Sequence, residues 1–226
     1  MLGAKVPGLV ECCRCPRLSR YIETLPPKKQ YTRSDYWARP VPGFGDPKAR
    51  ICLVGLAPGA HGANRTGRPF TGDGAGDFMY PLLYRAGFTS QPEAEHSQDG
   101  LVLDDLYITN AVKCVPPENK PKTDEFERCQ TYLEEELASL ERLRVLVLLG
   151  REAYLSYLKL LKSNGVIGRL SDHPFRHGQA FRPPEGPWVL SSYHTSRYNV
   201  QTGRMTPEMF GDLLDQASEL ARPESG

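Results

Sequence analysis

The 226-residue sequence contains no run of about 18 apolar residues, so we expect no segment of it to span a membrane. Its first residues lack the charged start and long apolar stretch of a secretory signal, which predicts a cytoplasmic protein. Internal repeats are absent, and a hydrophobic content of 39% indicates a single domain over residues 1–226. The glycine-rich segment 55–74 lacks both the P-loop lysine and the dinucleotide-binding glycine spacing, so it predicts neither of these nucleotide sites.

Charge is nearly balanced overall but unevenly distributed along the chain. Seven acids lie within residues 124–141, whereas residues 186–206 contain none. A basic stretch over residues 14–33 contains Glu23 as its single acid. One acidic face and two basic segments suit a phosphate-rich ligand such as nucleic acid, and ordinary variation of surface charge explains them equally well.

Four short apolar runs rich in β-branched residues predict strands that are buried on both faces. Helical patterns alternate with them, which predicts a parallel sheet covered by helices on both sides. The expected fold is a three-layer α/β/α sandwich with a four-stranded parallel central sheet. The predicted strands are residues 51–56, 106–112, 145–149 and 189–193, and the predicted helices are residues 77–86, 123–143, 151–162 and 207–221.

Polar residues follow or end three of these strands. The glycine-rich segment 55–74 comes after the first strand, where its backbone can approach a ligand closely. Asn110 lies inside an apolar strand, so its amide is either satisfied within the core or reads a polar ligand. His194 lies where the fourth strand enters an acid-free loop. Because ligands of parallel sheets bind beyond the C-terminal strand ends, we expect one site there.

Two distant cysteine pairs predict a metal centre. Cys12 and Cys15 form a C-x2-C pair, and Cys114 and Cys129 follow in the middle of the chain. In a reducing compartment such cysteines favour metal binding or catalysis over disulfides. Four thiolates suit an iron–sulfur cluster or a structural zinc, and their spacing does not separate the two. Cys52, inside a predicted strand, is expected to be a small packing residue.

Three motifs and this cysteine set resemble the type-five uracil-DNA glycosylases, which are iron–sulfur-containing relatives of the type-four enzymes. The motifs are GLAPGAHGANRTGRPFTGD, TNAVKCVPPENKP and YHTSRYNVQTGR, preceded by CCRCP, and they span residues 12–210. The resemblance implies a base excision repair enzyme that flips uracil out of DNA and hydrolyses its N-glycosidic bond. It also suggests action on hypoxanthine and xanthine.

The resemblance assigns roles to individual positions. Uracil would stack on Phe70 beside Ala57 and Gly59, and Asn110 would read its edge through O4 and N3. His194 would hydrogen-bond O2 and stabilise the charge that develops on the leaving base. A 4Fe–4S cluster, favoured over zinc by the resemblance alone, would be held by Cys12, Cys15, Cys114 and Cys129.

Further residues would contact DNA outside the base-binding site. The loop from Thr195 to Arg204 would enter the minor groove, with Arg197 and Arg204 on phosphates or groove edges and Tyr198 as a wedge. The cluster would be structural and would orient the basic segments 14–33 and 113–122 towards DNA. We expect a monomer whose partner is DNA containing deaminated bases.

The first motif departs from most related glycosylases, which carry a polar residue at the position of Leu56 or Ala57 to orient water. Both positions are apolar here, so another group must hold the water or stabilise the glycosyl cation. Asp73 is the first candidate and Asn119 the second, while Asp77 could also serve as a helix cap.

Two other functions remain open at this stage. A free nucleoside hydrolase would use the same pocket without needing Arg197 and Arg204. A non-catalytic, metal-stabilised nucleic-acid-binding module would leave Asp73, Asn110 and His194 without a role. Uracil release from an oligonucleotide distinguishes both from a glycosylase.

Overall fold

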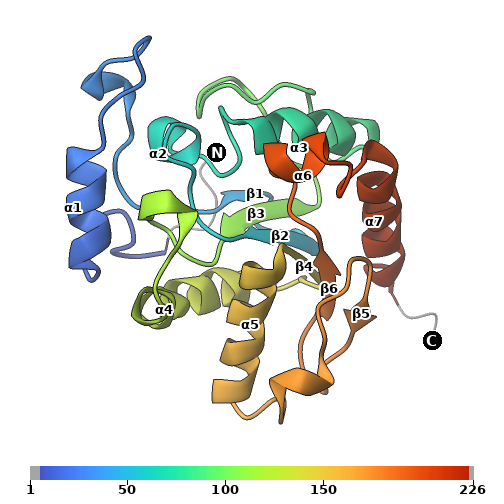
Figure 1. The fold of residues 1–226 in the computed structure, drawn as a ribbon. Helices are drawn as coiled ribbons and strands as arrows, with labels where there is room; N and C mark the ends of the chain where they lie inside the picture. The colour runs from blue at the N-terminus through green and yellow to red at the C-terminus, as the bar shows by residue number, and fades with distance from the viewer. Residues whose placement is uncertain (1–5, 224–226) are drawn as a thin grey trace.

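The computed structural model describes residues 6–223, which are arranged around one mixed β-sheet (Figure 1). Six strands form the sheet in the order β1-β3-β2-β4-β6-β5. They are β1 (Phe44–Gly45), β2 (Ile51–Gly55), β3 (Leu106–Asn110), β4 (Val145–Leu149), β5 (Ala180–Phe181) and β6 (Trp188–Ser192). The four inner strands are the predicted ones and run parallel, whereas β1 and β5 pair antiparallel at the two edges.

The expected α/β/α sandwich is confirmed, but the predicted number of four strands is wrong. Each edge strand is only two residues long, too short to leave a period in the sequence. The helices are α1 (Pro16–Thr24), α2 (Ala63–Thr66), α3 (Gly74–Arg85), α4 (Thr123–Ser139), α5 (Arg151–Ser163), α6 (Arg197–Gln201) and α7 (Pro207–Leu220). Short 3-10 turns are η1 (Arg33–Asp35), η2 (Pro117–Asn119) and η3 (Leu170–Asp172).

Both faces of the sheet are covered, as continuous apolar strands require (Figure 1). Leu53, Val147 and Leu190 belong to the core that also contains residues of α3 and α7. The alternate residues of the strands, among them Cys52 and Leu146, point to the other face and pack with residues of α4 and α5. Cys52 is fully buried there, as expected for a small packing residue.

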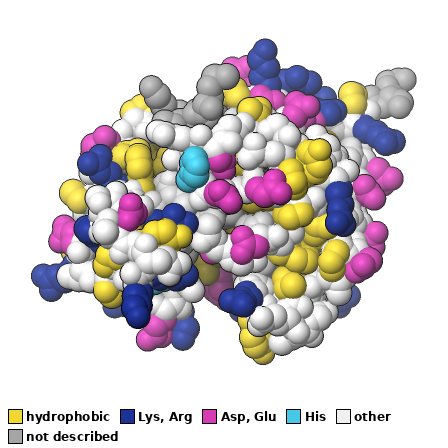
Figure 2. All heavy atoms as spheres, turned by 90° about the horizontal axis from the view of Figure 1, so that it is seen from above, with side chains coloured by type: hydrophobic (Ala, Val, Ile, Leu, Met, Phe, Trp, Pro, Cys, Tyr) yellow, Lys and Arg dark blue, Asp and Glu magenta, His cyan; other side chains and the backbone are white. Residues whose placement is uncertain are grey.

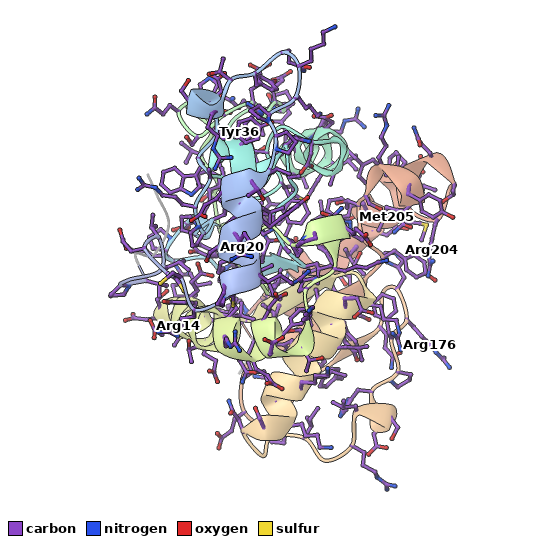
Figure 3. The ribbon with its side chains drawn as sticks, turned by 60° about the vertical axis from the view of Figure 1, so that its left-hand side comes forward. Arg14, Arg20, Tyr36, Arg176, Arg204 and Met205 are labelled. Carbon is purple, nitrogen blue, oxygen red and sulfur yellow. The ribbon has the colours of Figure 1, made fainter. Side chains whose placement is uncertain are left out.

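The N-terminal segment packs against α4 and against the segment that follows β3. Leu18 and Ile22 of α1 share a third apolar cluster with Cys114, Cys129 and Tyr132. The α1 helix is joined to α4 by a bidentate pair (Figure 3 shows α1 in front), because the guanidinium of Arg17 donates to both carboxylate oxygens of Glu125, each at 2.7 Å. This packing brings Cys12 and Cys15 close to Cys114 and Cys129.

Two sequence-based expectations about charge need correction at individual residues. Glu125 and Glu136 of α4 are buried, so two of the seven acids of residues 124–141 do not contribute to an acidic surface. Lys113 is also buried, where its Nζ donates to Thr109 Oγ1 at 2.6 Å and pairs with Glu136. It therefore cannot contact DNA as part of a basic segment, and its charge is neutralised inside the fold.

The surface seen from above carries mixed charge. Figure 2 shows lysines, arginines and acids interspersed on this face, without one continuous basic area. Within residues 6–223, none of the helices has the length and apolar character needed to cross a membrane.

Candidate active site

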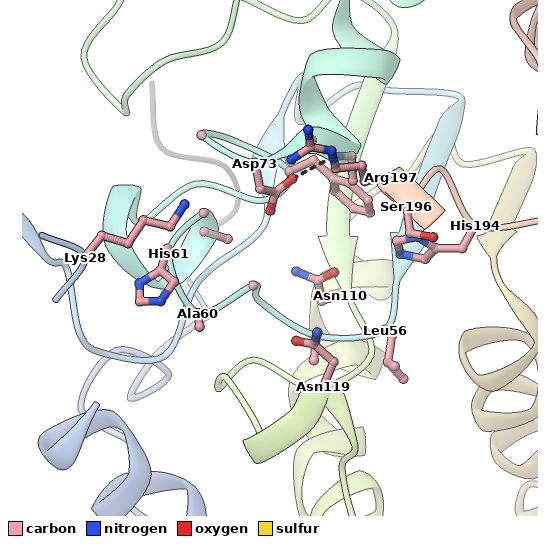
Figure 4. Close-up of a pocket in the computed structure, with 18 residues that line it drawn as sticks. Lys28, Leu56, Ala60, His61, Asp73, Asn110, Asn119, His194, Ser196 and Arg197 are labelled. Atoms are coloured by element: carbon pink, nitrogen blue, oxygen red, sulfur yellow. Dashed lines mark hydrogen bonds between the residues drawn. The ribbon is translucent and has the colours of Figure 1, made fainter. Parts of the chain in front are cut away.

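A cavity of about 550 Å³ lies at the C-terminal ends of β2, β3 and β6 (Figure 4). This is the position that the sequence predicts, because parallel strands bring their C-terminal ends to one edge of the sheet. The cavity collects residues from all three motifs. The predicted residues that line it are Ala57, Gly59, Phe70, Asp73, Asn110, Asn119, His194 and Arg197.

Gly55, the last residue of β2, sets the spacing of one wall. A Cβ atom built at Gly55 would lie 2.6 Å from Cζ of Phe70 and would overlap Oδ1 of Asn110. Only glycine therefore allows the ring and the amide to approach the strand so closely. Asn110 is 3% exposed, and no residue in the described part of the chain hydrogen-bonds its side-chain amide. The donor and acceptor atoms of the Asn110 amide are therefore available to a polar ligand.

The rings of Phe70 and His194 stack with centroids 5.9 Å apart and an interplanar angle of 30°. Phe70 has a φ of +53°, a left-handed conformation that is uncommon for a bulky residue. The surrounding structure holds this conformation and directs the ring at the cavity. Strained backbone of this kind is concentrated at ligand-binding positions.

His194 is a neutral imidazole with one nitrogen available to a ligand. Burial lowers its pKa to about 4, because the charged form would lose hydration. Its Nδ1 is buried, and none of residues 6–223 hydrogen-bonds it. A proton on Nδ1 would lack an acceptor, so the favoured tautomer carries the proton on Nε2. The residue can therefore donate one hydrogen bond into the cavity without carrying charge.

The two carboxylate oxygens of Asp73 have different environments. Oδ1 accepts from the backbone N–H groups of Ala75 at 3.1 Å and Gly76 at 3.2 Å, which caps α3. Oδ2 faces Gly59 and Gly62, since a Cβ at Gly59 would lie 2.9 Å from it. The cap fixes the side chain, and the second oxygen is left to act on a ligand or water. The cap also starts α3 at Gly74, three residues before the predicted start.

The other candidates for water binding differ in position. Asn119 lines the cavity at η2 with a φ of +56°, and Figure 4 shows its amide directed towards Asn110. Asp77 lies on α3 outside the cavity lining and is exposed. Burial and the neighbouring Asp73 raise its pKa, while Arg197 lowers it. Asp77 is therefore less well placed than Asp73 to act on a ligand.

The three predicted DNA-binding residues are only partly gathered at the cavity. Arg197 lines it at the start of α6. Tyr198 is 72% exposed, an unusual state for a large aromatic side chain. The Arg204 guanidinium lies 4.7 Å from the centre of the Tyr193 ring, outside the cavity lining, and Figure 3 shows it far from α1.

Sequence reasoning missed three polar residues of the cavity: Lys28, His61 and Ser196. His61 lies within the first motif, so its position in a glycine-rich loop was a usable signal. Lys28 comes from the N-terminal segment, whose packing against the loop has no local sequence pattern. Ser196 caps α6 through a 3.4 Å hydrogen bond from Asn199 N, and a single serine gives no such indication.

The four predicted metal ligands line one small cavity between α1, the segment after β3, and α4. As positioned, no three His, Cys, Asp or Glu side chains of residues 6–223 form a group that could hold a metal ion. The donor set nevertheless fits a thiophilic centre, because the lining contains four cysteines and no carboxylate or imidazole. Burial, followed by the other thiols, raises the pKa of Cys114. A bound cation would reverse this effect.

Comparison with known proteins gives matches over most of the chain. A sequence profile of the Uracil DNA glycosylase superfamily matches residues 42–218. A type-5 uracil-DNA glycosylase of Thermus thermophilus is 51% identical over 222 residues, covering 96% of this chain and 97% of that protein. A type-5 uracil-DNA glycosylase of Pyrobaculum aerophilum is 42% identical over 210 residues, covering 93% of this chain and 89% of that protein. A type-4 uracil-DNA glycosylase of Archaeoglobus fulgidus is 38% identical over 123 residues, covering 54% of this chain and 52% of that protein.

Proposed function

Because this chain belongs to the uracil DNA glycosylase superfamily, and within it to the type-5 uracil-DNA glycosylases, we propose that it removes uracil from DNA in base excision repair. The reaction hydrolyses the N-glycosidic bond and leaves an abasic site. A base inside a duplex is inaccessible, so it must first flip into a pocket at a cost of a few kcal/mol. The observation that carries the proposal is the meeting of Phe70, Asn110 and His194 at one cavity.

The three side chains match the chemistry of a flipped uracil. The Phe70 ring offers a stacking platform, which contributes about 1–3 kcal/mol per base. The Asn110 amide can accept from N3–H and donate to O4, which satisfies both of its polar atoms. The Nε2–H of His194 donates to O2, where negative charge grows as the bond to deoxyribose breaks. A donor placed at developing charge is worth about 10²–10³-fold in rate.

We propose that Asp73 holds the attacking water and stabilises the cationic sugar. Its Oδ1 is engaged in the α3 cap, so Oδ2 is the oxygen that can accept from water. As the glycosidic bond breaks, the electron pair goes to uracil and the sugar becomes an oxocarbenium-like cation, which a carboxylate stabilises. Water then adds to C1′ and loses a proton to solvent, and this proton balances the one that the departing uracil anion takes up. Asn119, at the same cavity, is the second candidate for holding this water.

Arg197, which lines the cavity, and Tyr198 and Arg204, which lie outside its lining, are proposed to contact DNA. Tyr198 is exposed on α6 next to the cavity, as a side chain that enters the duplex must be.

The hydrophobic residues Leu56 and Ala57 line the cavity and offer no polar side chain that would reject a larger base. We therefore also propose hypoxanthine and xanthine as substrates.

We propose that Cys12, Cys15, Cys114 and Cys129 hold a 4Fe–4S cluster, with zinc as the alternative. The backbone N–H of Lys113 donates to Cys129 Sγ at 3.2 Å, a type of contact that stabilises cluster sulfurs. A centre at this position joins α1 to α4 and to the segment that follows β3. Its proposed role is structural, because the glycosylase reaction transfers no electrons.

A uracil-release assay on a duplex oligonucleotide tests the proposed activity. The same duplex with thymine in place of uracil is the control. Release of free uracil and a strand that breaks at the abasic site in alkali are expected. A chain that binds the duplex but releases no base would instead be a nucleic-acid-binding module.

A further inference from the structure

His61, a cavity residue to which neither the motifs nor the proposed reaction gives a role, ends a chain of hydrogen bonds. The backbone N–H of Lys28 donates to Tyr36 Oη at 3.1 Å. Tyr36 Oη lies 2.7 Å from His61 Nδ1. Because the tyrosine oxygen accepts from Lys28, its single proton is free to be donated to the imidazole. We therefore assign the acceptor role to His61 Nδ1.

With this assignment, the hydrogen bonds of Lys28 and Tyr36 select one tautomer of His61. A neutral imidazole that accepts at Nδ1 carries its proton on Nε2, and no residue of the described chain accepts from that nitrogen. Burial, followed by the charges of Lys28 and Arg65, lowers the pKa of His61 and keeps the ring neutral at physiological pH. The residue thus offers one oriented hydrogen-bond donor to a ligand of the cavity.

Further contacts hold His61 in place. Its carbonyl accepts from Arg65 Nε at 3.0 Å, and the Arg65 guanidinium lies 4.4 Å from the centre of the Tyr31 ring. The rings of Tyr36 and His61 meet edge to face, with centroids 6.0 Å apart. A donor held in this way is pre-organised, so little rotamer entropy is lost when it binds a ligand.

Lys28 adds positive charge beside this donor. Its side chain is exposed and lines the same cavity, and no salt bridge occupies it among residues 6–223. The backbone of Lys28 is held at both ends, since its carbonyl accepts from Tyr31 N at 2.8 Å. A neutral N–H donor and an ammonium together suit a phosphate oxygen.

The order of groups along the cavity indicates which phosphate. Figure 4 shows His194 at one end, Asp73 between, and Lys28 with His61 at the other end. A nucleotide whose base contacts His194 and whose sugar faces Asp73 would direct its phosphate towards Lys28 and His61. We propose that His61 and Lys28 bind a backbone phosphate that adjoins the flipped nucleotide. This inference rests on the proposed function.

A phosphate-replacement experiment tests this contact. Duplexes contain a non-cleavable 2′-fluoro-deoxyuridine, with either normal phosphates or one neutral methylphosphonate on the 5′ or the 3′ side. Affinities are measured for the full chain and for His61→Ala and Lys28→Ala. Lys29→Ala is the matched control, because Lys29 is exposed next to Lys28 but does not line the cavity.

On normal DNA, each of the two variants should lose about tenfold in affinity, as expected for a hydrogen bond to a charged group. On the duplex that lacks the contacted phosphate, both losses should shrink to less than about twofold, because the group they bind is already neutral. Lys28→Ala should also lower the salt slope of binding by about 0.9, whereas His61→Ala should not.

Tyr36→Phe keeps both phosphate-binding side chains and removes only the proton that fixes the tautomer, so it should lose less affinity than His61→Ala. Losses that are equal on all three duplexes would overturn the proposal. Uracil release by the unmodified chain is measured in parallel: its absence would refute the proposed function, whereas release without coupling to either phosphate would refute only this contact.

Discussion

Asp73 combines a structural and a chemical role in one carboxylate. Its Oδ1 caps α3 through Ala75 and Gly76, while Oδ2 faces the loop of Gly59 and Gly62. The same residue that begins the helix thereby positions the group proposed to hold water. Substitutions at this position can separate the two roles, because asparagine caps a helix about as well as aspartate but carries no charge.

Asp73→Asn is expected to lower uracil release by about 10²-fold or more, since the carboxylate that stabilises the cationic sugar is lost. Its unfolding free energy should stay near that of the unmodified chain. Asp73→Ala should lose the same activity and, in addition, about 1 kcal/mol of stability because the cap is gone. Single-turnover release and urea denaturation measure the two effects, and full turnover by Asp73→Asn would assign the water to another group such as Asn119.

His194 should make stability depend on pH. Its pKa is lowered by burial to about 4, whereas an unfolded histidine titrates near 6.5. Between these values the unfolded chain binds a proton that the folded chain does not, so the unfolding free energy decreases as pH falls from about 6.5 to 4. His194→Gln should show a shallower decrease between pH 7.5 and 5 in urea denaturation. Parallel pH dependences for the two proteins would contradict this assignment.

At the scale of elements, the end of β2 determines the geometry of the site. Gly55 pairs with Asn110 in the parallel register of β2 and β3, and both Phe70 and the Asn110 amide lie against its Cα. Because Gly55 has no side chain, the Phe70 ring and the Asn110 amide can both pack against the strand at this position.

Gly55→Ala is therefore expected to displace Phe70 and Asn110 and to cost about 1–3 kcal/mol of stability, the usual penalty of overpacking. Uracil release should fall more than stability, because small displacements of a base-binding site strongly reduce rate. Gly168→Ala is the matched control, since an added Cβ there meets no atom within 4 Å. An unchanged release rate for Gly55→Ala would show that the two side chains do not depend on this close approach.

The sequence predicts elements whose burial leaves a pattern and misses those that depend on distant partners. The inner strands and the four long helices after α1 were predictable because apolar runs and helical periods reflect burial on the sheet. Edge strands β1 and β5 are too short for a period. Lys113 reads as a surface base, and only the three-dimensional fold reveals its partner Glu136.

The candidate site divides in the same way. The positions of Asn110 and His194 were predictable because each ends or follows a buried strand, and strand ends meet in a parallel sheet. Phe70 lies in the loop after β2, and only the family resemblance pointed to it. Lys28 and the tautomer of His61 depend on Tyr36, which the chain brings in from another segment. No sequence pattern marks such chains of hydrogen bonds, so only the structure reveals them.

At the scale of the whole molecule, the cysteine centre is proposed to hold the N-terminal segment, which carries Lys28, against the rest of the fold. Cys114→Ser should therefore lower both stability and affinity for DNA. Cys13→Ser is the control, because Cys13 is exposed and does not line the cysteine cavity. Absorbance in the visible range distinguishes an iron–sulfur cluster from zinc. Unchanged folding and DNA affinity in Cys114→Ser would contradict the structural role.

Phosphate contacts made by Arg197 and Arg204 should appear in the salt dependence of binding. Arg197→Ala and Arg204→Ala should each reduce the slope of log affinity against log salt by about 0.9, as expected when one phosphate contact is lost. Arg169→Ala is a suitable comparison, since Arg169 is exposed and lies outside the base cavity. Slopes identical to that of the unmodified chain would mark both residues as ordinary surface arginines.

The most direct test of the central claim, that Phe70, Asn110 and His194 form one base-binding site, is release of uracil from a duplex by the unmodified chain and by His194→Ala. The unmodified chain should release uracil, and the variant should bind the duplex within a few-fold of normal while its rate falls by about 10²–10³-fold. Release by His194→Ala at the normal rate, or an equal loss of binding and turnover, would contradict the account.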